Sequence, residues 1–298
     1  MKKTLSNILF LSDWFAKIQP YKNLLLFRYS LYFFLLFKIF WLLPVFSDLM
    51  SIYNISPGKS VDPFYLITDP ILQLVGNSIS EKIFISVCLL IICAAIWKKH
   101  KIALSVLVFI ISLCFNEILT PLINGGDRMH CLLLFVNIFF ITNKNLITSE
   151  LRKNIGNFFL YGIQLHICLF YFISGADKIL DPLWRNGEAL ISISQLSNYS
   201  TNGMQNFMNI KLAVILSWAA IIFELSFGIL IWMKKTKTII LFIGLVFHLF
   251  ISVFLSLPDF SLVMIISYLL FVPADFFKTK NLKTKKPAFS SGLFVPNN

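Results

Sequence analysis

The stretch Thr238–Leu257, TIILFIGLVFHLFISVFLSL, holds 20 residues without one charged side chain. A helix of that length extends about 30 Å, which matches the hydrocarbon thickness of a bilayer. Three lysines lie just before it, within Lys234–Lys237, and Asp259 follows it. The pattern predicts a transmembrane helix whose basic end lies in the cytoplasm.

Seven further apolar runs share this character. The 298-residue sequence as a whole is 57% hydrophobic and only 13% charged, with a mean hydropathy of +0.79, whereas soluble domains carry about a quarter charged residues. We therefore predict an all-α fold, a polytopic membrane helix bundle of about eight transmembrane helices. The other seven runs are Leu24–Phe46, Ile83–Trp97, Ile102–Ile123, Met129–Thr142, Phe158–Gly175, Leu212–Met233 and Phe260–Pro273.

The basic residues predict the orientation of the bundle. If the N-terminus lies inside and the runs alternate, 18 of the 26 Lys and Arg residues fall in inner segments and six in outer ones. This asymmetry follows the positive-inside rule and places both termini in the cytoplasm. We therefore expect the net charge of +12 to reflect attraction of the basic segments to the anionic inner leaflet of the bilayer, and not binding of nucleic acid.

Three segments can be separated by composition. Residues 1–22 form a basic, amphipathic segment expected to lie on the inner membrane surface. Residues 23–275 form one transmembrane domain, without an internal repeat typical of an inverted-repeat transporter. Residues 276–298 form a basic cytoplasmic tail whose composition predicts disorder. The Lys-rich, Arg-poor composition hints at a bacterium with an AT-rich genome, and hence at the bacterial inner membrane.

Several charged or polar side chains lie inside the apolar runs, where a charge costs at least ~2.5 kcal/mol. Arg28 lies near the inner end of its run and can extend to the surface. Lys38 lies deeper in the same run, and Glu224 and His248 lie near the middle of two later ones. Hydrogen bonds between helices and a functional role are about equally good explanations for Glu224 and His248.

The run Phe158–Gly175 and the residues after it carry the most informative spacing. Gln164, Tyr171 and Lys178 are seven residues apart, so they share one helix face with little drift. For Gln164 taken alone, a structural role and a functional role are again about equally good explanations. Lys178 differs, because burial at the mouth of a polar stripe favours the neutral amine, which can act as a base.

Metal and haem sites find little support. The four histidines form no HxxxH or HExxH pattern, and no CxxC accompanies them, so we expect no metal site. A haem held by His166 and His248, both at mid-run depth, is a minor alternative.

Three stretches together resemble the HTTM family, the membrane module shared with vitamin K-dependent gamma-carboxylases. The first is NGGDR at Asn124–Arg128, and the second is QLHICLFYFISGADK at Gln164–Lys178, followed by Trp184 and Gly187. The third runs from Glu224 through Phe247-His248 and Asp259-Phe260 to Tyr268. The similarity extends over the predicted domain 23–275, and its most specific part ends at Lys178.

The resemblance implies an enzyme of the lyase or oxygenase type. In the carboxylases the lysine that matches Lys178 is the proposed base, which deprotonates vitamin K hydroquinone on the luminal side. It implies vitamin K hydroquinone or another quinol as cofactor here. Convergence of costly polar residues predicts an outward-facing pocket for it, lined by Asp127, Gln164, Tyr171, Glu224 and His248.

A different function stays open. Asp127 stands where the animal carboxylases have a histidine, and a short basic tail stands where they carry a large luminal region that holds the protein substrate. The Gly-Gly-Asp segment and compact size also resemble the membrane protein of the sporulation-delaying toxin system. The alternative is therefore a non-catalytic membrane protein that helps to mature or export a secreted peptide.

Overall fold

The computed structural model describes residues 21–55, 64–98, 101–120, 122–140, 150–196 and 203–272. Every regular element within these ranges is a helix. The predicted surface segment 1–22, except its last two residues, and the tail 276–298 lie outside them. The elements are α2 (Tyr21–Leu42), η1 (Leu43–Val45), α3 (Phe46–Ile55), α4 (Tyr65–Leu72), α5 (Ser78–Trp97), α6 (Ile102–Ile118), α7 (Gly125–Asn137), α8 (Glu150–Leu180), α9 (Pro182–Arg185), α10 (Glu188–Gln195), α11 (Met204–Phe207), α12 (Ile210–Leu230), α13 (Lys237–Phe254), α14 (Pro258–Ser267) and η3 (Tyr268–Leu270).

Each of the eight predicted apolar runs overlaps one helix, and these helices are α2, α5, α6, α7, α8, α12, α13 and α14. Within the described ranges, five segments are long and apolar enough to cross a membrane, which makes the chain an integral membrane protein. The helices α6, α7 and α14 are shorter, so eight crossings and the cytoplasmic termini stay predictions. The five segments are Lys22–Ile55, Ser78–Trp97, Leu151–Leu180, Ile210–Leu230 and Lys237–Phe254.

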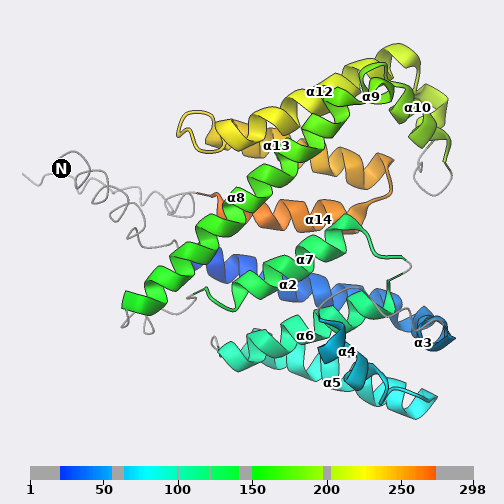
Figure 1. Cartoon of the computed structure of the whole chain (residues 1–298), viewed down its shortest axis with the longest axis vertical. Helices are drawn as coiled ribbons and strands as arrows, with labels where there is room; N and C mark the ends of the chain where they lie inside the picture. Colours follow the sequence, from blue (N-terminus) through cyan, green and yellow to red (C-terminus); the bar gives the residue numbers. More distant parts are fainter. Residues whose placement is uncertain are drawn as a thin grey trace, which may run out of the picture.

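The helices form two groups joined by α14 (Figure 1). In one group α8 packs along α12, and α13 packs against α12. In the other group α2, α5, α6 and α7 pack on one another. The helix α14 contacts α13 on one side and α7 and α2 on the other, so it lies at the centre of the molecule.

The junction between α7 and α14 depends on a glycine. The side chain of Asn124 accepts hydrogen bonds from the backbone N–H groups of Gly126 and Asp127, which fixes the first turn of α7. A Cβ atom on Gly126 would lie 2.5 Å from the Cα of Phe260. Only a residue without a side chain allows the starts of α7 and α14 to lie this close together.

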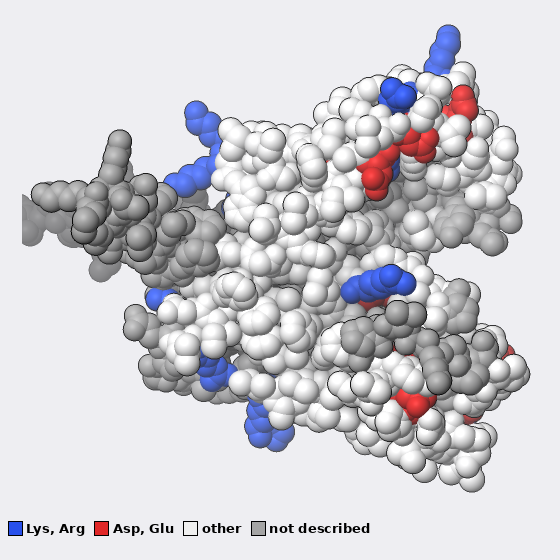
Figure 2. All heavy atoms as spheres, in the orientation of Figure 1, with Lys and Arg blue, Asp and Glu red and all other residues white. Residues whose placement is uncertain are grey.

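Charged side chains separate between the two ends of the bundle. On the face shown in Figure 2, the Asp and Glu residues lie on the right-hand side, near α9 and α10 at the top and near α3 and α4 lower down, with some Lys and Arg among them. The left-hand side shows Lys and Arg and no Asp or Glu among the residues drawn in colour. This distribution agrees with the orientation predicted from the basic residues.

The expectation that Arg28 extends to the membrane surface is wrong. Arg28 is 1% exposed, and its Nη2 donates to the carbonyl oxygen of Ala95 at 3.0 Å. The side chain therefore lies between α2 and α5, because a backbone carbonyl of the neighbouring helix offers an acceptor inside the protein.

Candidate functional site

The polar stripe predicted around Tyr171 lies on one face of α8. Gln164 and Tyr171 are buried, and the side chain of Lys178 is 17% exposed. The stripe therefore faces the protein interior, as predicted from the heptad spacing. The opposite face carries the exposed side chains of Leu165, Leu169, Phe172 and Ile173.

Lys178 and Glu224 form an ion pair between α8 and α12. The Nζ atom of Lys178 donates to both carboxylate oxygens of Glu224, each at 2.9 Å, and to the hydroxyl of Ser174 at 2.6 Å. The Ser174 hydroxyl donates in turn to Oε1 of Glu224 at 3.2 Å. Three polar groups thus contact one another in a closed set, with Glu224 almost fully enclosed by protein.

Gly175 allows α8 and α12 to approach at this pair. A Cβ atom at Gly175 would lie 3.1 Å from the Cβ of Glu224 and 3.0 Å from the Cγ of Leu225. A larger residue would push α12 away, which would lengthen the contact between Lys178 and Glu224.

Tyr171, His248 and Tyr268 form a second polar group, about two turns before Lys178 along α8. The hydroxyl of Tyr171 lies 2.6 Å from Nε2 of His248 and 2.7 Å from the hydroxyl of Tyr268. Two arrangements satisfy both contacts. Either Tyr268 donates to Tyr171 and Tyr171 donates to His248, or His248 donates to Tyr171 and Tyr171 donates to Tyr268. The Nδ1 atom of His248 is buried and has no hydrogen-bond partner among the described residues.

Aromatic rings enclose this second group. The rings of Phe247 and Phe260 have centroids 5.2 and 5.6 Å from that of His248. Phe227 lies 4.3 Å from the ring of Tyr171. The imidazole is therefore held in an aromatic, largely apolar environment in which each polar contact counts for more than in water.

Gln164 has a different neighbour from the rest of the stripe. Its Nε2 donates to the carbonyl oxygen of Leu270 at 2.6 Å. The contact ties α8 to η3, and Gln164 makes no hydrogen bond to the other predicted site residues in the described part of the chain.

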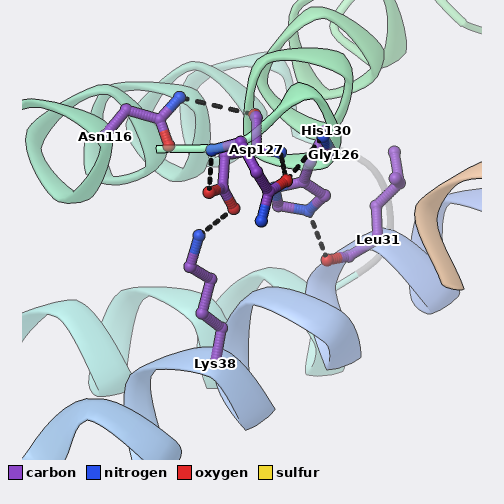
Figure 3. Close-up of polar contacts among 7 residues, drawn as sticks. Leu31, Lys38, Asn116, Gly126, Asp127 and His130 are labelled. Carbon is purple, nitrogen blue, oxygen red and sulfur yellow. Dashed lines mark hydrogen bonds and ion pairs between the residues drawn. The ribbon is translucent and has the colours of Figure 1, made fainter. Parts of the chain in front are cut away.

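Asp127 lies in a separate cluster at the start of α7 (Figure 3). It forms an ion pair with Lys38 of α2 through Oδ1. Its Oδ2 accepts from the backbone N–H of Asn124 at 3.2 Å, and its carbonyl oxygen accepts from Nδ2 of Asn116 at 3.4 Å. The ion pair thus joins α2 to α7, with a further contact from α6.

His130 packs against this cluster one turn later on α7. Its Nε2 lies 3.1 Å from the carbonyl oxygen of Leu31, and its ring lies 4.8 Å from that of Phe34. Among the described residues, Asp127 forms no ion pair or hydrogen bond with the other predicted site residues. The structure therefore divides the predicted site into a cluster around Lys178 and another around Lys38.

Three contributors were not selected from the sequence. Tyr268 follows a short apolar helix and gives no periodic signal of its own. Trp184, whose ring lies 5.1 Å from the Nζ atom of Lys178, was noted only as part of the resemblance. Lys38 was recognised as a costly charge, but its partner is 89 residues away, beyond any pattern of local spacing.

The histidines do not converge. His166 is exposed on α8, whereas His248 is completely buried, so the two imidazoles do not flank one space as haem ligands would. Among the described residues, no group of three His, Cys, Asp or Glu side chains could hold a metal ion.

The family model of the HTTM domain matches residues 136–276. Five of the six predicted site residues lie in the matched region, and Asp127 lies just before it. The match begins at residue 136, and the domain range 23–275 stays a prediction. No curated protein and no solved structure matches the chain significantly.

Proposed function

We propose that this integral membrane HTTM protein is a quinol-dependent enzyme of the carboxylase or epoxidase type, with an outward-facing active site and Lys178 as its base. The observation that carries the proposal is the contact of Lys178 with Glu224 and Ser174, on the most specific stretch of the carboxylase resemblance. An amine, a carboxylate and a hydroxyl in mutual contact can pass a proton among themselves.

The pairing with Glu224 gives Lys178 a route to its neutral form. A base must be neutral before it can accept a proton, and Glu224 lies close enough to take one from the ammonium group. Low-dielectric surroundings disfavour separated charges, which narrows the free-energy gap between the ionic pair and the neutral amine with a carboxylic acid. Lys178 can then take a hydroxyl proton from a substrate at the outer mouth of the stripe.

The groups near this pair are of the kinds that contact a quinol in the proposed function. A bound quinol would supply the electrons for the reaction with O2, as the resemblance implies. The rings around His248 suit a planar aromatic head group, and the unpartnered Nδ1 atom is a polar group that a quinol oxygen would satisfy. In this proposal Tyr171 and His248 orient the head group, and Lys178 receives the proton.

The test is quinol epoxidation by the purified protein in lipid nanodiscs. With vitamin K hydroquinone and O2, the wild type and a Lys211→Ala control are expected to form epoxide above the protein-free level. Lys211 lies exposed at the start of α12, whereas Lys178→Ala should form epoxide about 10²–10⁴-fold more slowly, the usual contribution of a general base. Wild-type protein that forms no epoxide from vitamin K hydroquinone, menaquinol or ubiquinol would refute the proposal.

The alternative of a non-catalytic protein for peptide maturation or export is favoured by one feature of the same pair. An ammonium group has three N–H donors, and the contacts with Ser174 and the two Glu224 oxygens occupy all three. Such a saturated pair can be purely structural. If it is, a cell that carries only the Lys178→Arg variant should still release its mature secreted peptide, because arginine preserves the ion pair.

A further inference from the structure

We propose that Trp184 is a gate and positioning residue for Lys178. The inference rests on the proposed function for its chemical meaning, and its structural basis is independent of that function. It concerns how a substrate reaches the amine and what holds the amine toward Glu224 when no substrate is bound.

The indole covers Lys178 from outside its own helix. The Nζ atom lies 5.1 Å from the centre of the Trp184 ring, a distance typical of cation–π contacts. Ser174 on α8 and Glu224 on α12 accept hydrogen bonds from the amine, and the ring of Trp184 contacts it from α9. The side chain of Lys178 retains 17% exposure. In this proposal a substrate that approaches Nζ passes beside the indole or displaces it.

The backbone around Trp184 is built to hold the ring in this place. Asp181 caps α9 by accepting from the N–H of Leu183 at 2.9 Å, and Pro182 starts the turn. The carbonyl oxygen of Trp184 accepts from the N–H of Gly187 at 3.1 Å. Trp184 therefore lies on a hydrogen-bonded single turn, and this turn follows the end of α8 and packs against α12 (Figure 1).

Gly187 fixes that turn against α12. Its φ of +78° is a conformation that other residues adopt only with strain. A Cβ atom there would lie 2.6 Å from the backbone nitrogen of Val214 and 2.9 Å from the carbonyl carbon of Ala213. The turn can therefore contact the backbone of α12 directly. In this proposal the contact fixes the position of Trp184 relative to Lys178.

The consequence for a substrate is a selection by shape. A planar aromatic group can stack on an indole, and a flat ring is also what can slide between the indole and the amine. A bulky or strongly hydrated molecule would have to remove Trp184 from Lys178 altogether. The gate therefore favours flat, apolar head groups, which is the substrate class of the proposed function.

Chemical labelling of Lys178 tests the gate without any need for turnover. The intact protein in nanodiscs is treated with a water-soluble acetylating reagent, and the labelling rates of Lys178 and Lys211 are measured by peptide mass spectrometry. Trp184→Ala should raise the rate at Lys178 relative to Lys211 by about tenfold, equivalent to about 1.4 kcal/mol of protection. Trp184→Phe, which keeps a ring, should restore the slow rate, and Leu183→Ala on the exposed side of the same turn should not change it.

Gly187→Ala supplies a second test that leaves Trp184 in the sequence. It should lift the turn from α12 and accelerate labelling of Lys178 in the same direction. Equal labelling rates in the wild type, Trp184→Ala and Gly187→Ala, with unfolding temperatures that show all three folded, would overturn the gate. If these variants label faster but no quinol is oxidised by the wild type, the gate stands and the proposed function fails.

Discussion

In the described part of the chain, the ion pair of Lys38 with Asp127 and that of Lys178 with Glu224 differ in how they are enclosed. Lys38 and Asp127 have side chains 9% and 4% exposed, whereas Lys178 and Glu224 are 17% and 6% exposed. The first pair joins α2 to α7 before the HTTM domain begins. The second joins α8 to α12 within it.

The partners of the two carboxylates also differ in kind. Asp127 is held by the backbone N–H of Asn124 at the start of a helix, in addition to Lys38, and a helix start favours a fixed negative charge. Glu224 is held by side chains only, from Ser174 and Lys178. A hydroxyl and an amine can exchange partners, whereas a backbone amide in a capping box cannot. From this difference we expect the first pair to stabilise the fold, and it is the second pair to which the proposed function assigns the chemistry.

The largest effect on stability is expected at the enclosed pair. Asp127→Ala leaves the ammonium group of Lys38 buried without its partner, which should lower the free energy of unfolding by about 3–5 kcal/mol. Denaturant unfolding in detergent micelles measures the change. Asp48→Ala, on an exposed position of α3, should change it by less than about 0.5 kcal/mol. An equally small change in the free energy of unfolding for Asp127→Ala would show that the first pair does not stabilise the fold.

The contact that holds this cluster against α14 should give the next largest effect. Gly126→Ala places a methyl group into the backbone of Phe260, and overpacking of this kind costs about 1–3 kcal/mol. Gly162→Ala is the matched control, because a Cβ there meets nothing within 4 Å, and helix propensity predicts a gain of up to about 1 kcal/mol. Two variants of equal stability would show that the approach of α7 to α14 is not tight.

A smaller loss of stability is expected at the second pair. Glu224→Ala should cost about 1–2 kcal/mol, because Lys178 keeps its contact with Ser174 and part of its exposure. The same unfolding assay compares it with Asp127→Ala. An equal decrease in the free energy of unfolding for both alanine variants would contradict the distinction between the two pairs.

The sequence predicted the fold well where the signal was local. Apolar runs of about 20 residues are almost sufficient to locate transmembrane helices, and all eight runs overlap helices. The face of α8 that carries Tyr171 and Lys178 was predicted from heptad spacing alone. The lengths of α6, α7 and α14 were less predictable. Their ends contain polar residues, and a hydropathy profile does not show where a helix ends among such residues.

The site was predictable only in part, because its pairs join distant segments. Costly charges at Lys38, Asp127 and Glu224 were visible, but the choice of partner depends on which helices pack together. Asp127 was grouped with Lys178 because both are polar and near the outer end, whereas the packing of α7 on α2 gives Lys38 to Asp127. Arg28 shows the same limit, since its acceptor at Ala95 is a backbone atom without a signature in the sequence.

The central claim is that Lys178 acts as a base, whereas its charge alone would suffice for a structural pair. Lys178→Arg tests it most directly, because arginine keeps the ion pair with Glu224 but does not become neutral near pH 7. We predict that the free energy of unfolding of this variant lies within about 1 kcal/mol of the wild-type value. We also predict that it forms epoxide from vitamin K hydroquinone about 10²-fold or more slowly in the nanodisc assay. A Lys178→Arg protein that is folded and as active as the wild type would contradict the account, since the charge and not the proton would then be what Lys178 provides.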